Sequence, residues 1–554
     1  MSFLEKYNYW LEHSDKETVA ELKAISDDQA EIKDRFYKDL EFGTAGLRGV
    51  IGAGSNRMNI YTVAKASKGF ADYILSKGEA AKEDGIVIAH DNRRMSREFA
   101  EITAGVLAAN GIKSYLFESL RTTPELSFAV RYLGCFGGVV ITASHNPPEY
   151  NGYKLYDKNG CQLVPHFADE VTGFVNAVPD ELGVKFLSLE EAGELVEIVG
   201  EEIDEIYYEE VLALQFDFDQ DRNIKVVYTP QHGTGNIPVR DVLDEAGYMV
   251  LPVLSQCDPD PDFSGTKSPN PEVPTAYEAA IELMKEHGAD IAIATDPDCD
   301  RLGAVINCGD DYKLITGNQS GAILLHYILT RMTEQGSMPE NPVMINTVVT
   351  STLGDRVAES FGVDVEKTLT GFKFIGDKIH KHNAKGDKNY VFGYEESYGC
   401  LIGDFARDKD AVQASLMFCE AADYYKKQGK TLVDVLDDLA DKFGYYLDTQ
   451  SSTFFRGADG SDKMNALLED MRKNPIKEAA GIKVVSTEDF LLNPPEDFVP
   501  SNVLRFNLED GSFVAIRPSG TEPKCKVYYC VRGENKADAE RKLAALKEVF
   551  DVKA

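Results

Sequence analysis

Short apolar runs that end in polar loops alternate with helical segments along most of this 554-residue chain. Strands that alternate with helices of ordinary length form βαβ units, and such units build a largely parallel sheet. The pattern restarts near residue 224 and again after residue 317, so we predict three consecutive mixed α/β sheet domains. The expected strands lie at residues 86–90, 114–117, 138–143, 224–229, 249–254, 291–294, 343–347, 363–367 and 390–393.

The last part of the chain follows a different order. From about Tyr445 it reads helix, three strands and a second helix, with the strands expected at residues 503–507, 512–516 and 526–531. This order predicts a smaller C-terminal α+β domain. A chain of this length exceeds what one hydrophobic core usually supports. The expected domains are residues 1–207, which open with a helical extension, then 208–315, 316–445 and 446–554.

The composition argues against several classes of partner. Acidic residues outnumber basic ones by 92 to 58, and the formal net charge is −34, which disfavours nucleic acid and anionic membranes. A site for a phosphate ester must therefore be locally basic. Nine cysteines without a CxxC pair indicate reduced thiols in a cytoplasmic protein. The sequence shows neither a signal-peptide pattern nor an apolar run of about 18 residues that could span a membrane.

A candidate nucleophile follows the apolar run at residues 138–143. Ser144, His145 and Asn146 come directly after it, and Pro147-Pro148 prevents either a helix or a strand from continuing. Ser144 is therefore expected on a rigid loop at the carboxyl end of a strand, where open α/β sheets place their active sites. An ordinary strand-to-loop turn is the alternative for this motif alone.

Three aspartates alternate in the loop DPDCDR, at positions 296, 298 and 300. Two carboxylates about 4 Å apart repel by roughly 4 kcal/mol at an effective dielectric near 20, so three converging ones need a cation. Ligands that are all oxygen indicate Mg²⁺ or Ca²⁺ rather than zinc. An EF-hand is excluded because Arg301 replaces its glycine and Asn307 its last glutamate. A solvated acidic turn is the remaining alternative.

Two further loops carry chemistry suited to a sugar phosphate. Residues 393–399 read GYEESYG, where a carboxylate and a hydroxyl suit vicinal sugar hydroxyls; an acid/base pair is the alternative, although adjacent side chains diverge. Residues 517–524 read RPSGTEPK, in which Arg517 and the backbone N–H groups of residues 519–521 form an anion site, with a plain hairpin as the alternative. Nearby basic residues are Lys373, Arg407 and Lys409, and the glycine-rich FGTAGLRG at residues 42–49 adds Thr44 and Arg48.

The four loops, in this order, resemble those of the alpha-D-phosphohexomutase superfamily. The resemblance covers nearly the whole chain, and it is strongest to the bacterial phosphoglucomutase branch, which has a helical extension before FGTAGLRG and reads GYEESYG. It implies four domains around a central cleft. In chain order these would carry the phosphoserine, the metal, the sugar site and the phosphate site.

The resemblance also implies a role for each matching residue. Ser144 would be the phosphoserine, and an oxygen of its phosphate would complete a site for one Mg²⁺ with Asp296, Asp298 and Asp300. Lys154 matches the general acid/base position, and Arg48 and Lys373 match basic residues that face the transferring phosphoryl group. The positions that match substrate-binding residues are Thr44, His145, Arg301, Glu395, Ser397, Arg407, Arg517, Ser519, Gly520, Thr521 and Lys524.

The activity implied by this resemblance is the interconversion of glucose 1-phosphate and glucose 6-phosphate through a phosphoserine and a glucose 1,6-bisphosphate. A phosphomannomutase or a phosphopentomutase would use the same machinery and is the nearest alternative. A silent phosphosugar-binding protein and a phosphatase are alternatives of other classes. The expected partner is a small phosphosugar, with no nucleic acid and no membrane, and the sequence leaves monomer and dimer open.

Overall fold

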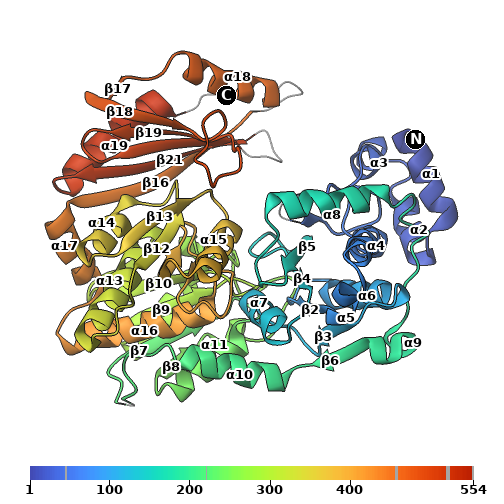
Figure 1. The fold of residues 1–554 in the computed structure, drawn as a ribbon, viewed down its shortest axis with the longest axis horizontal. Helices are drawn as coiled ribbons and strands as arrows, with labels where there is room; N and C mark the ends of the chain where they lie inside the picture. Colours follow the sequence, from blue (N-terminus) through green and yellow to red (C-terminus); the bar gives the residue numbers. More distant parts are fainter. Residues whose placement is uncertain (44–45, 220, 456–459, 519–523, 552–554) are drawn as a thin grey trace. The chain divides into compact units, whose positions relative to one another are not determined.

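The structure is a computed structural model that describes residues 1–43, 46–219, 221–455, 460–518 and 524–551 (Figure 1). The chain forms two compact units. Unit 1 comprises Met1–Ile315, Ile375–Gly386 and Gly399–Asp423. Unit 2 comprises Thr316–Phe374, Asp387–Tyr398 and Tyr424–Ala554. The chain thus returns to unit 1 twice after residue 374.

The first sheet of unit 1 has six strands in the order β1-β5-β4-β2-β3-β6. Strands β2, β3, β4 and β6 run parallel, while β5 is antiparallel to both β1 and β4. All five residues of β2 and of β4 are buried, as expected for the centre of a parallel sheet covered on both faces. The strands are β1 (Leu47–Val50), β2 (Ile86–His90), β3 (Ser114–Phe117), β4 (Gly137–Ile141), β5 (Tyr150–Asp157) and β6 (Val196–Val199).

Helices cover this sheet, and a group of further helices precedes it at the N-terminus. Helices α1 to α3 form a small cluster of their own around the buried side chains of Trp10, Leu22 and Phe36. Helices α4, α6 and α8 share one apolar core with the sheet, which includes Phe70, Phe99 and Val171. The bounds are α1 (Phe3–His13), α2 (Lys16–Ala24), α3 (Gln29–Phe36), α4 (Ile60–Ser76), α5 (Glu79–Asp84), α6 (Ser96–Ala109), α7 (Thr123–Tyr132), α8 (Pro165–Ala177) and α9 (Leu189–Ala192).

The second sheet of unit 1 has the order β11-β10-β9-β7-β8. Its strands β7, β8 and β9 are parallel, and the hairpin partners β10 and β11 are antiparallel. The strands are β7 (Lys225–Thr229), β8 (Met249–Pro252), β9 (Ile291–Thr295), β10 (Leu302–Asn307) and β11 (Tyr312–Ile315). The helices near it are α10 (Glu201–Leu212), α11 (Asn236–Glu245), α12 (Glu278–His287) and the later α16 (Ala411–Lys427).

Unit 2 begins with a parallel sheet in which β12 pairs with both β13 and β14. These strands are β12 (Pro342–Thr347), β13 (Asp364–Thr368) and β14 (Asn389–Tyr394). The long helix α13 starts at a capping box in which the Thr316 hydroxyl accepts from the Gln319 N–H. The helices of this part are α13 (Gly317–Gln335), α14 (Thr352–Ser360), the start of α15 (Phe372–Lys385) and α17 (Leu432–Phe443).

The C-terminal part of unit 2 is an antiparallel sheet in the order β16-β21-β20-β19-β18-β17. Its core includes Phe506, Val514 and Tyr529, against which Leu546 and Phe550 of the last helix pack. The strands are β16 (Tyr445–Phe454), β17 (Glu478–Ala479), β18 (Ile482–Asp489), β19 (Leu504–Leu508), β20 (Phe513–Pro518) and β21 (Lys524–Gly533). The helices are α18 (Gly460–Lys473) and α19 (Lys536–Phe550).

These sheets confirm the predicted fold class of three α/β sheets followed by an α+β domain. The sequence did not predict β1, β5, β6, β10, β11, β16, β17 and β18, nor the two-residue strand β15 (Cys400–Leu401). Apart from β6 and β15, each of these pairs antiparallel with a neighbour and so does not belong to the parallel βαβ pattern from which the other strands were predicted. Strand β18, with the sequence IKVVSTED, is mostly exposed and polar and therefore lacks the apolar run that marked the others.

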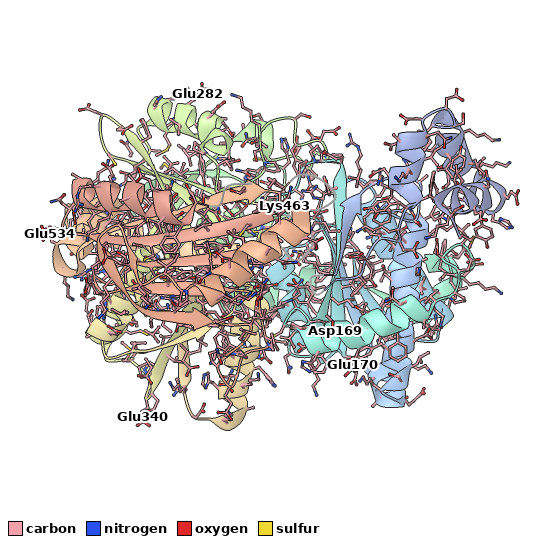
Figure 2. The ribbon with its side chains drawn as sticks, turned by 90° about the horizontal axis from the view of Figure 1, so that it is seen from above. Asp169, Glu170, Glu282, Glu340, Lys463 and Glu534 are labelled. Carbon is pink, nitrogen blue, oxygen red and sulfur yellow. The ribbon has the colours of Figure 1, made fainter. Side chains whose placement is uncertain are left out.

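The excess of acidic residues lies on the solvent-facing surface. Figure 2 shows Asp169, Glu170 and Glu282 with their side chains directed outward, as are Glu340 and Glu534, and all five are exposed. Solvated carboxylates of this kind repel one another only weakly in water. None of the described helices combines the length and the apolar character needed to cross a membrane.

Candidate active site

Ser144 lies three residues after β4, in a loop whose backbone turns sharply. Its φ is +52°, a left-handed conformation that is uncommon for a residue other than glycine and that clusters at functional sites. The Ser144 N–H donates to the Thr142 hydroxyl at 2.8 Å. The side chain is only 4% exposed, so the hydroxyl is held in a fixed and largely dry position.

A buried arginine on a separate loop holds this turn. Arg93, 3% exposed, donates through one terminal nitrogen to the carbonyl oxygens of Ser144 and Asn146. Its other terminal nitrogen donates to the carbonyl oxygens of Pro147 at 2.8 Å and Tyr150 at 3.0 Å. One guanidinium therefore binds four carbonyl oxygens of the segment between β4 and β5. Because Arg93 follows β2, these bonds hold the Ser144 loop against the end of that strand.

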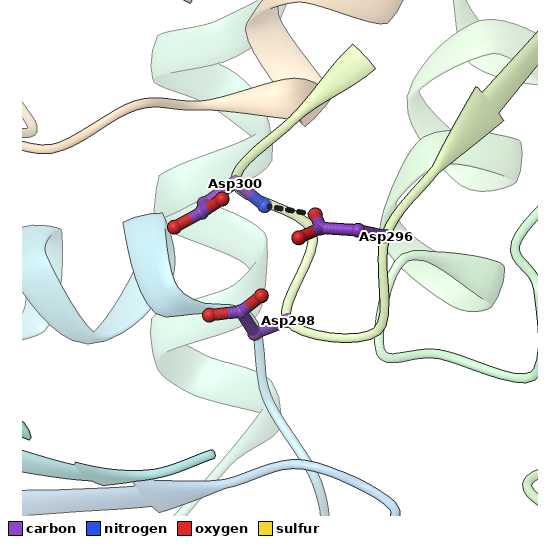
Figure 3. A group of neighbouring side chains, drawn as sticks. All are labelled: Asp296, Asp298 and Asp300. Carbon is purple, nitrogen blue, oxygen red and sulfur yellow. Dashed lines mark hydrogen bonds between the residues drawn. The ribbon is translucent and has the colours of Figure 1, made fainter. Parts of the chain in front are cut away.

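The three aspartates predicted to bind a metal converge on one point. All three are buried, and a carboxylate oxygen from each lies within 4.8 Å of the other two. Figure 3 shows how the loop after β9 curls so that the carboxylates face a common space. Two backbone N–H groups, those of Asp300 at 3.1 Å and Arg301 at 3.0 Å, donate to Asp296 Oδ1 and close the loop. Cys299 allows the turn by adopting a φ of +55°.

Ser144 and the aspartate loop are in direct contact. Ser144 Oγ donates to Asp296 Oδ2 at 2.7 Å and lies 3.2 Å from His145 Nδ1. Burial and then the positive charges of Arg301 and Arg48 hold the pKa of His145 well below its ordinary value. His145 is therefore a neutral neighbour of Ser144.

Two lysines partly offset the three negative charges. Lys154 Nζ, from β5, donates to Asp298 Oδ2 at 2.8 Å, and Lys409 Nζ lies 3.0 Å from Asp300 Oδ2. Burial alone would raise the pKa of Asp298, but the Lys154 ammonium holds it below its ordinary range. Burial, together with the charges of Asp298 and Asp300, raises the pKa of Asp296 well above its usual value. The two lysines therefore do not balance the charge of the three aspartates, and the remaining negative charge favours binding of a cation.

The residues of the cluster fit a divalent metal ion. Within the described part of the chain, the Oδ1 atoms of Asp298 and Asp300 are buried and have no hydrogen-bond partner. Buried carboxylate oxygens without partners are costly unless a cation satisfies them. The donors are all oxygen, which Mg²⁺ and Ca²⁺ prefer, and no histidine or cysteine belongs to the cluster.

The loop predicted to bind sugar hydroxyls lies in unit 2. Glu395 is buried, and its Oε1 accepts a hydrogen bond from the Gly371 N–H at 2.7 Å. Gly371 lies two residues before Lys373 in the chain. Burial and then the charge of Glu395 raise the pKa of Glu396 to about 7, against which Arg517 acts in the opposite direction. Glu396 of the predicted sugar loop and Arg517 are therefore close enough to interact electrostatically.

The other predicted residues are placed as follows. Arg48 NH1 donates to Asn146 Oδ1 at 3.1 Å, beside the Ser144 loop. Arg407 is buried and pairs with Asp404 at 3.2 Å, and Lys524 Nζ lies 4.8 Å from the ring centre of Phe454. Ser397 is half-buried in the loop after β14. Thr44, Ser519, Gly520 and Thr521 lie outside the described residues.

Sequence reasoning did not single out two residues that position the site. One is Arg93, and the other is Thr123, whose hydroxyl donates to Asp298 Oδ2 at 3.0 Å and whose N–H donates to the Asp298 carbonyl at 2.9 Å. A signal for Arg93 exists, because DNRR follows an apolar strand as the other functional loops do. The sequence indicates Lys409 only as a nearby basic residue, because its contact with Asp300 depends on tertiary structure.

Four family models match consecutive parts of the chain. They are described as Phosphoglucomutase/phosphomannomutase, alpha/beta/alpha domain I at residues 39–181, domain II at 205–309, domain III at 316–443, and the C-terminal domain at 464–548. The chain therefore belongs to the phosphoglucomutase/phosphomannomutase family, which is part of the alpha-D-phosphohexomutase superfamily.

Individual relatives agree with this family assignment. The chain is 38% identical over 545 residues to a phosphoglucomutase of Staphylococcus haemolyticus, a match that covers 95% of this chain and 96% of the relative. Among solved structures, parafusin, a phosphoglucomutase from Paramecium in an open form, has a TM-score of 0.70 at 20% identity, covering 93% and 94% of the two chains. A phosphoglucomutase/phosphomannomutase family protein from Burkholderia thailandensis has a TM-score of 0.68 at 19% identity, covering 92% and 96%.

Proposed function

We propose that this protein is a phosphoglucomutase that interconverts α-D-glucose 1-phosphate and glucose 6-phosphate. The observation that carries the proposal is the contact between Ser144 Oγ and Asp296 in a buried cluster of three aspartates. A hydroxyl at the end of a buried strand, next to an oxygen-only cation site, suits phosphoryl transfer. The bacterial phosphoglucomutase similar over almost its entire length supports glucose phosphates as the substrates.

Ser144 would carry the phosphoryl group between the two ends of the sugar. In the first step a sugar hydroxyl attacks the phosphorus of the phosphoserine, the bond from phosphorus to Ser144 Oγ breaks, and the hydroxyl proton passes to Oγ. The product is glucose 1,6-bisphosphate, and the reverse reaction at its other phosphate restores the phosphoserine. Lys154 Nζ lies 2.8 Å from Asp298, and Ser144 Oγ lies 2.7 Å from Asp296 of the same cluster, so Lys154 would relay that proton.

One divalent cation, Mg²⁺, would be held by Asp296, Asp298 and Asp300 together with an oxygen of the phosphoserine. When bound, it would neutralise negative charge on the phosphate oxygens during transfer. Arg48 and Arg301 would add positive charge near the same oxygens, as the transfer requires positioning and charge neutralisation more than covalent help. Lys373 is proposed to face the transferring group as well.

The remaining residues are proposed to hold the sugar phosphate. Glu395 and Ser397 would accept and donate hydrogen bonds at vicinal sugar hydroxyls, with His145 and Arg407 as further contacts. The phosphate that does not react would bind at the loop of Arg517, Ser519, Gly520 and Thr521, and Thr44 and Lys524 would be further substrate contacts. A site of this kind must accept either phosphate of the bisphosphate, because the intermediate has to reverse its orientation between the two transfers.

We further propose the domain roles expected from the sequence. Residues 1–207 would bear the phosphoserine, 208–315 the metal, 316–445 the sugar site and 446–554 the phosphate site. The nine cysteines are all free thiols, which supports a reducing, cytoplasmic location. Glucose 1,6-bisphosphate would act as activator by phosphorylating Ser144.

The test compares the turnover of glucose 1-phosphate, mannose 1-phosphate and ribose 1-phosphate with Mg²⁺ and a trace of the matching bisphosphate. We expect glucose 1-phosphate to give the highest kcat/KM and a chelator to abolish the activity. A higher kcat/KM with mannose or ribose 1-phosphate would move the assignment to the alternative mutase. Release of inorganic phosphate without isomerisation would contradict both assignments.

A further inference from the structure

Strand β5 supplies two buried side chains on one face, and each of them begins a separate route to the aspartate cluster. Side chains two positions apart in a strand point to the same side of the sheet, so Lys154 and Tyr156 share a face. Lys154 Nζ donates directly to Asp298 Oδ2 at 2.8 Å. Tyr156, only 1% exposed, has no role in the proposed reaction, and its hydroxyl donates to Asp408 Oδ2 at 2.8 Å.

Asp408 connects Tyr156 to Lys409. The Asp408 side chain is buried, and its other oxygen, Oδ1, accepts from the Lys409 N–H at 2.8 Å and from Lys409 Nζ at 2.9 Å. The same ammonium lies 3.0 Å from Asp300 Oδ2. An unbroken series of contacts, all within unit 1, therefore runs from Tyr156 to a carboxylate of the cluster.

The segment that leads into Asp408 is fixed against α7. The Arg407 N–H donates to Ser127 Oγ at 2.8 Å. Three residues earlier in the segment, the Asp404 carbonyl oxygen accepts from Arg131 NH1 at 2.6 Å. Because Ser127 and Arg131 both belong to α7, this helix holds the backbone on which Asp408 is carried.

The protonation states of the series make its hydrogen bonds strong. Burial, and then the charge of Asp408, raise the pKa of Tyr156 well above its usual value, so the phenol keeps its proton and donates it. Burial alone would raise the pKa of Asp408, but the Lys409 ammonium holds it below its usual value. Hydrogen bonds to an ionised carboxylate are shorter and stronger than those between neutral groups.

The contact with Lys409 determines which oxygen of Asp300 remains for a cation. Lys409 engages Oδ2, whereas Oδ1 is buried without a hydrogen-bond partner in the described part of the chain. The ion pair of that Oδ1 with Arg301 Nε is long, at 3.7 Å. Asp298 shows the same division, because Lys154 engages its Oδ2 and its Oδ1 has no hydrogen-bond partner among the same residues. In both aspartates, a bond to one oxygen orients the other.

We propose that Tyr156 and Asp408 are positioning residues of the metal site: they hold Lys409 against Asp300 and thereby keep Asp300 Oδ1 directed at the cation. The inference rests on the metal binding that belongs to the proposed function, and it adds two residues that act only through Lys409. Outer partners of this kind typically contribute about 10- to 100-fold to metal affinity or activity. Strand β5 then supports two of the three aspartates, one through Lys154 and one through Tyr156.

Tyr156→Phe removes one hydroxyl and leaves every charge in place. Isothermal titration of the unphosphorylated protein with MgCl₂ should show that this variant binds Mg²⁺ at least about tenfold more weakly than the original protein. The matched control is Tyr207→Phe, because Tyr207 is also fully buried and donates to Asp410 at 2.8 Å. Asp410 keeps two N–H donors at the start of α16, at 2.9 and 3.0 Å, so the control should bind Mg²⁺ as the original protein does.

A double-mutant cycle tests the route through Lys409. In a Lys409→Met background the Tyr156 hydroxyl has no ammonium to hold in place, so Tyr156→Phe should change the Mg²⁺ affinity by less than about twofold. An equal loss in both backgrounds would show that the effect does not pass through Lys409 and would overturn the proposal. If Lys409→Met does not bind Mg²⁺, the same cycle with Asp408→Asn decides. Asp408→Asn also replaces Tyr156→Phe if circular dichroism shows the latter to be unfolded.

Turnover gives a second readout. Tyr156→Phe should lower kcat at limiting Mg²⁺, saturating Mg²⁺ should restore it, and KM for the sugar phosphate should not change. A loss that saturating Mg²⁺ does not restore would indicate a purely structural role and would overturn the proposal, as would an unchanged Mg²⁺ affinity. If the original protein binds no Mg²⁺, the proposed metal site fails and the inference with it. If it binds Mg²⁺ but is not a mutase, the calorimetry alone decides the inference.

Discussion

Ser144 combines a strained backbone, a buried hydroxyl and a carboxylate acceptor at 2.7 Å. These features are supplied by different parts of the chain: the turn by its own loop, the acceptor by the loop after β9, and the support by Arg93. As the proposed nucleophile, Ser144 would act through a covalent intermediate, which removal of the hydroxyl makes impossible.

Ser144→Ala should therefore lose mutase activity by roughly 10³-fold or more, on the scale seen when a covalent nucleophile is removed. The measurement is kcat with glucose 1-phosphate and a trace of bisphosphate, together with the incorporation of phosphate into the protein. Ser26→Ala, at an exposed position of unit 1, is the control and should keep full activity. Full activity in Ser144→Ala would contradict the proposed mechanism.

Arg93→Lys tests the support of the serine loop. Lysine keeps the charge but cannot reach four carbonyl oxygens with a planar fork, so the loop should shift. Because a displacement of about 1 Å can cost about 100-fold in rate, we expect kcat/KM to fall by roughly that factor. Arg94→Lys is a closely matched control, since the neighbouring Arg94 is half-exposed and pairs with Asp262. Equal activities of the two variants would show that Arg93 does not position Ser144.

At the scale of elements, the strands that begin the functional loops were the predictable ones. The apolar runs of β4 and β9 are buried along their whole length. The loops after them carry a serine and three aspartates, whose possible roles can be inferred from the sequence alone. Strand β5 is different: its sequence YNGYKLYD is polar, and its burial follows from pairing with both β1 and β4. That pairing depends on segments that lie far apart in the chain. The sequence therefore indicates that Lys154 lies near Ser144, but it does not show that a strand holds it there.

Strand β16 carries a carboxylate that the fold does not fully satisfy. Asp448 lies opposite Cys530 of β21, and its Oδ1 has no hydrogen-bond partner among the described residues. Burial raises its pKa to about 6, although the Cys530 thiol and the Ser351 hydroxyl act in the opposite direction. A raised pKa means that the folded protein binds the proton more tightly than the unfolded chain, so the stabilisation is present below about pH 4 and is lost as the pH rises through about 6.

Asp448→Asn cannot ionise and should remove this loss. Relative to the original protein, the variant should gain stability between pH 4 and pH 7, by up to roughly 3 kcal/mol at 1.4 kcal/mol per pKa unit. Urea unfolding at the two pH values measures the gain. The control is Asp437→Asn on the exposed face of α17, for which the difference from the original protein should be the same at both pH values. A gain for Asp448→Asn that does not depend on pH would contradict the assignment.

At the scale of the whole molecule, the metal cluster belongs entirely to unit 1. A ligand that binds only the folded state stabilises it by mass action, by about 2.7 kcal/mol at a concentration 100 times its Kd. Mg²⁺ should therefore raise the unfolding temperature of unit 1 by a few degrees relative to EDTA and leave unit 2 unchanged. Differential scanning calorimetry at constant ionic strength measures both transitions.

The control variants are Asp298→Asn, which should abolish the Mg²⁺ effect, and Asp310→Asn, an exposed aspartate near the same sheet, which should retain it. An equal increase in both transitions, or in both variants, would indicate a general salt effect instead of binding at the cluster.

The sequence predicted the layered fold, and each candidate loop could be identified because it carries its residues within a few positions of one another. It could not predict how segments far apart combine. Lys409 reaches Asp300 from more than one hundred positions away, and Thr123 reaches Asp298 from the start of α7. Nor did it predict that residues 399–423 return to unit 1.

That return has a consequence for synthesis on the ribosome. Unit 1 is interrupted after Ile315 and is completed only by residues up to Asp423, where Glu420 accepts from the N–H groups of Phe216 and Asp217 and Asp423 from that of Asn223. At about 5–20 residues per second, translation of this interval takes roughly 5 to 20 s. During that time the nascent chain has Asp300 but not yet Lys409, and the N–H groups of Phe216, Asp217 and Asn223 lack their acceptors on Glu420 and Asp423. The metal site is thus among the last parts of unit 1 to mature, although most of its residues are made early.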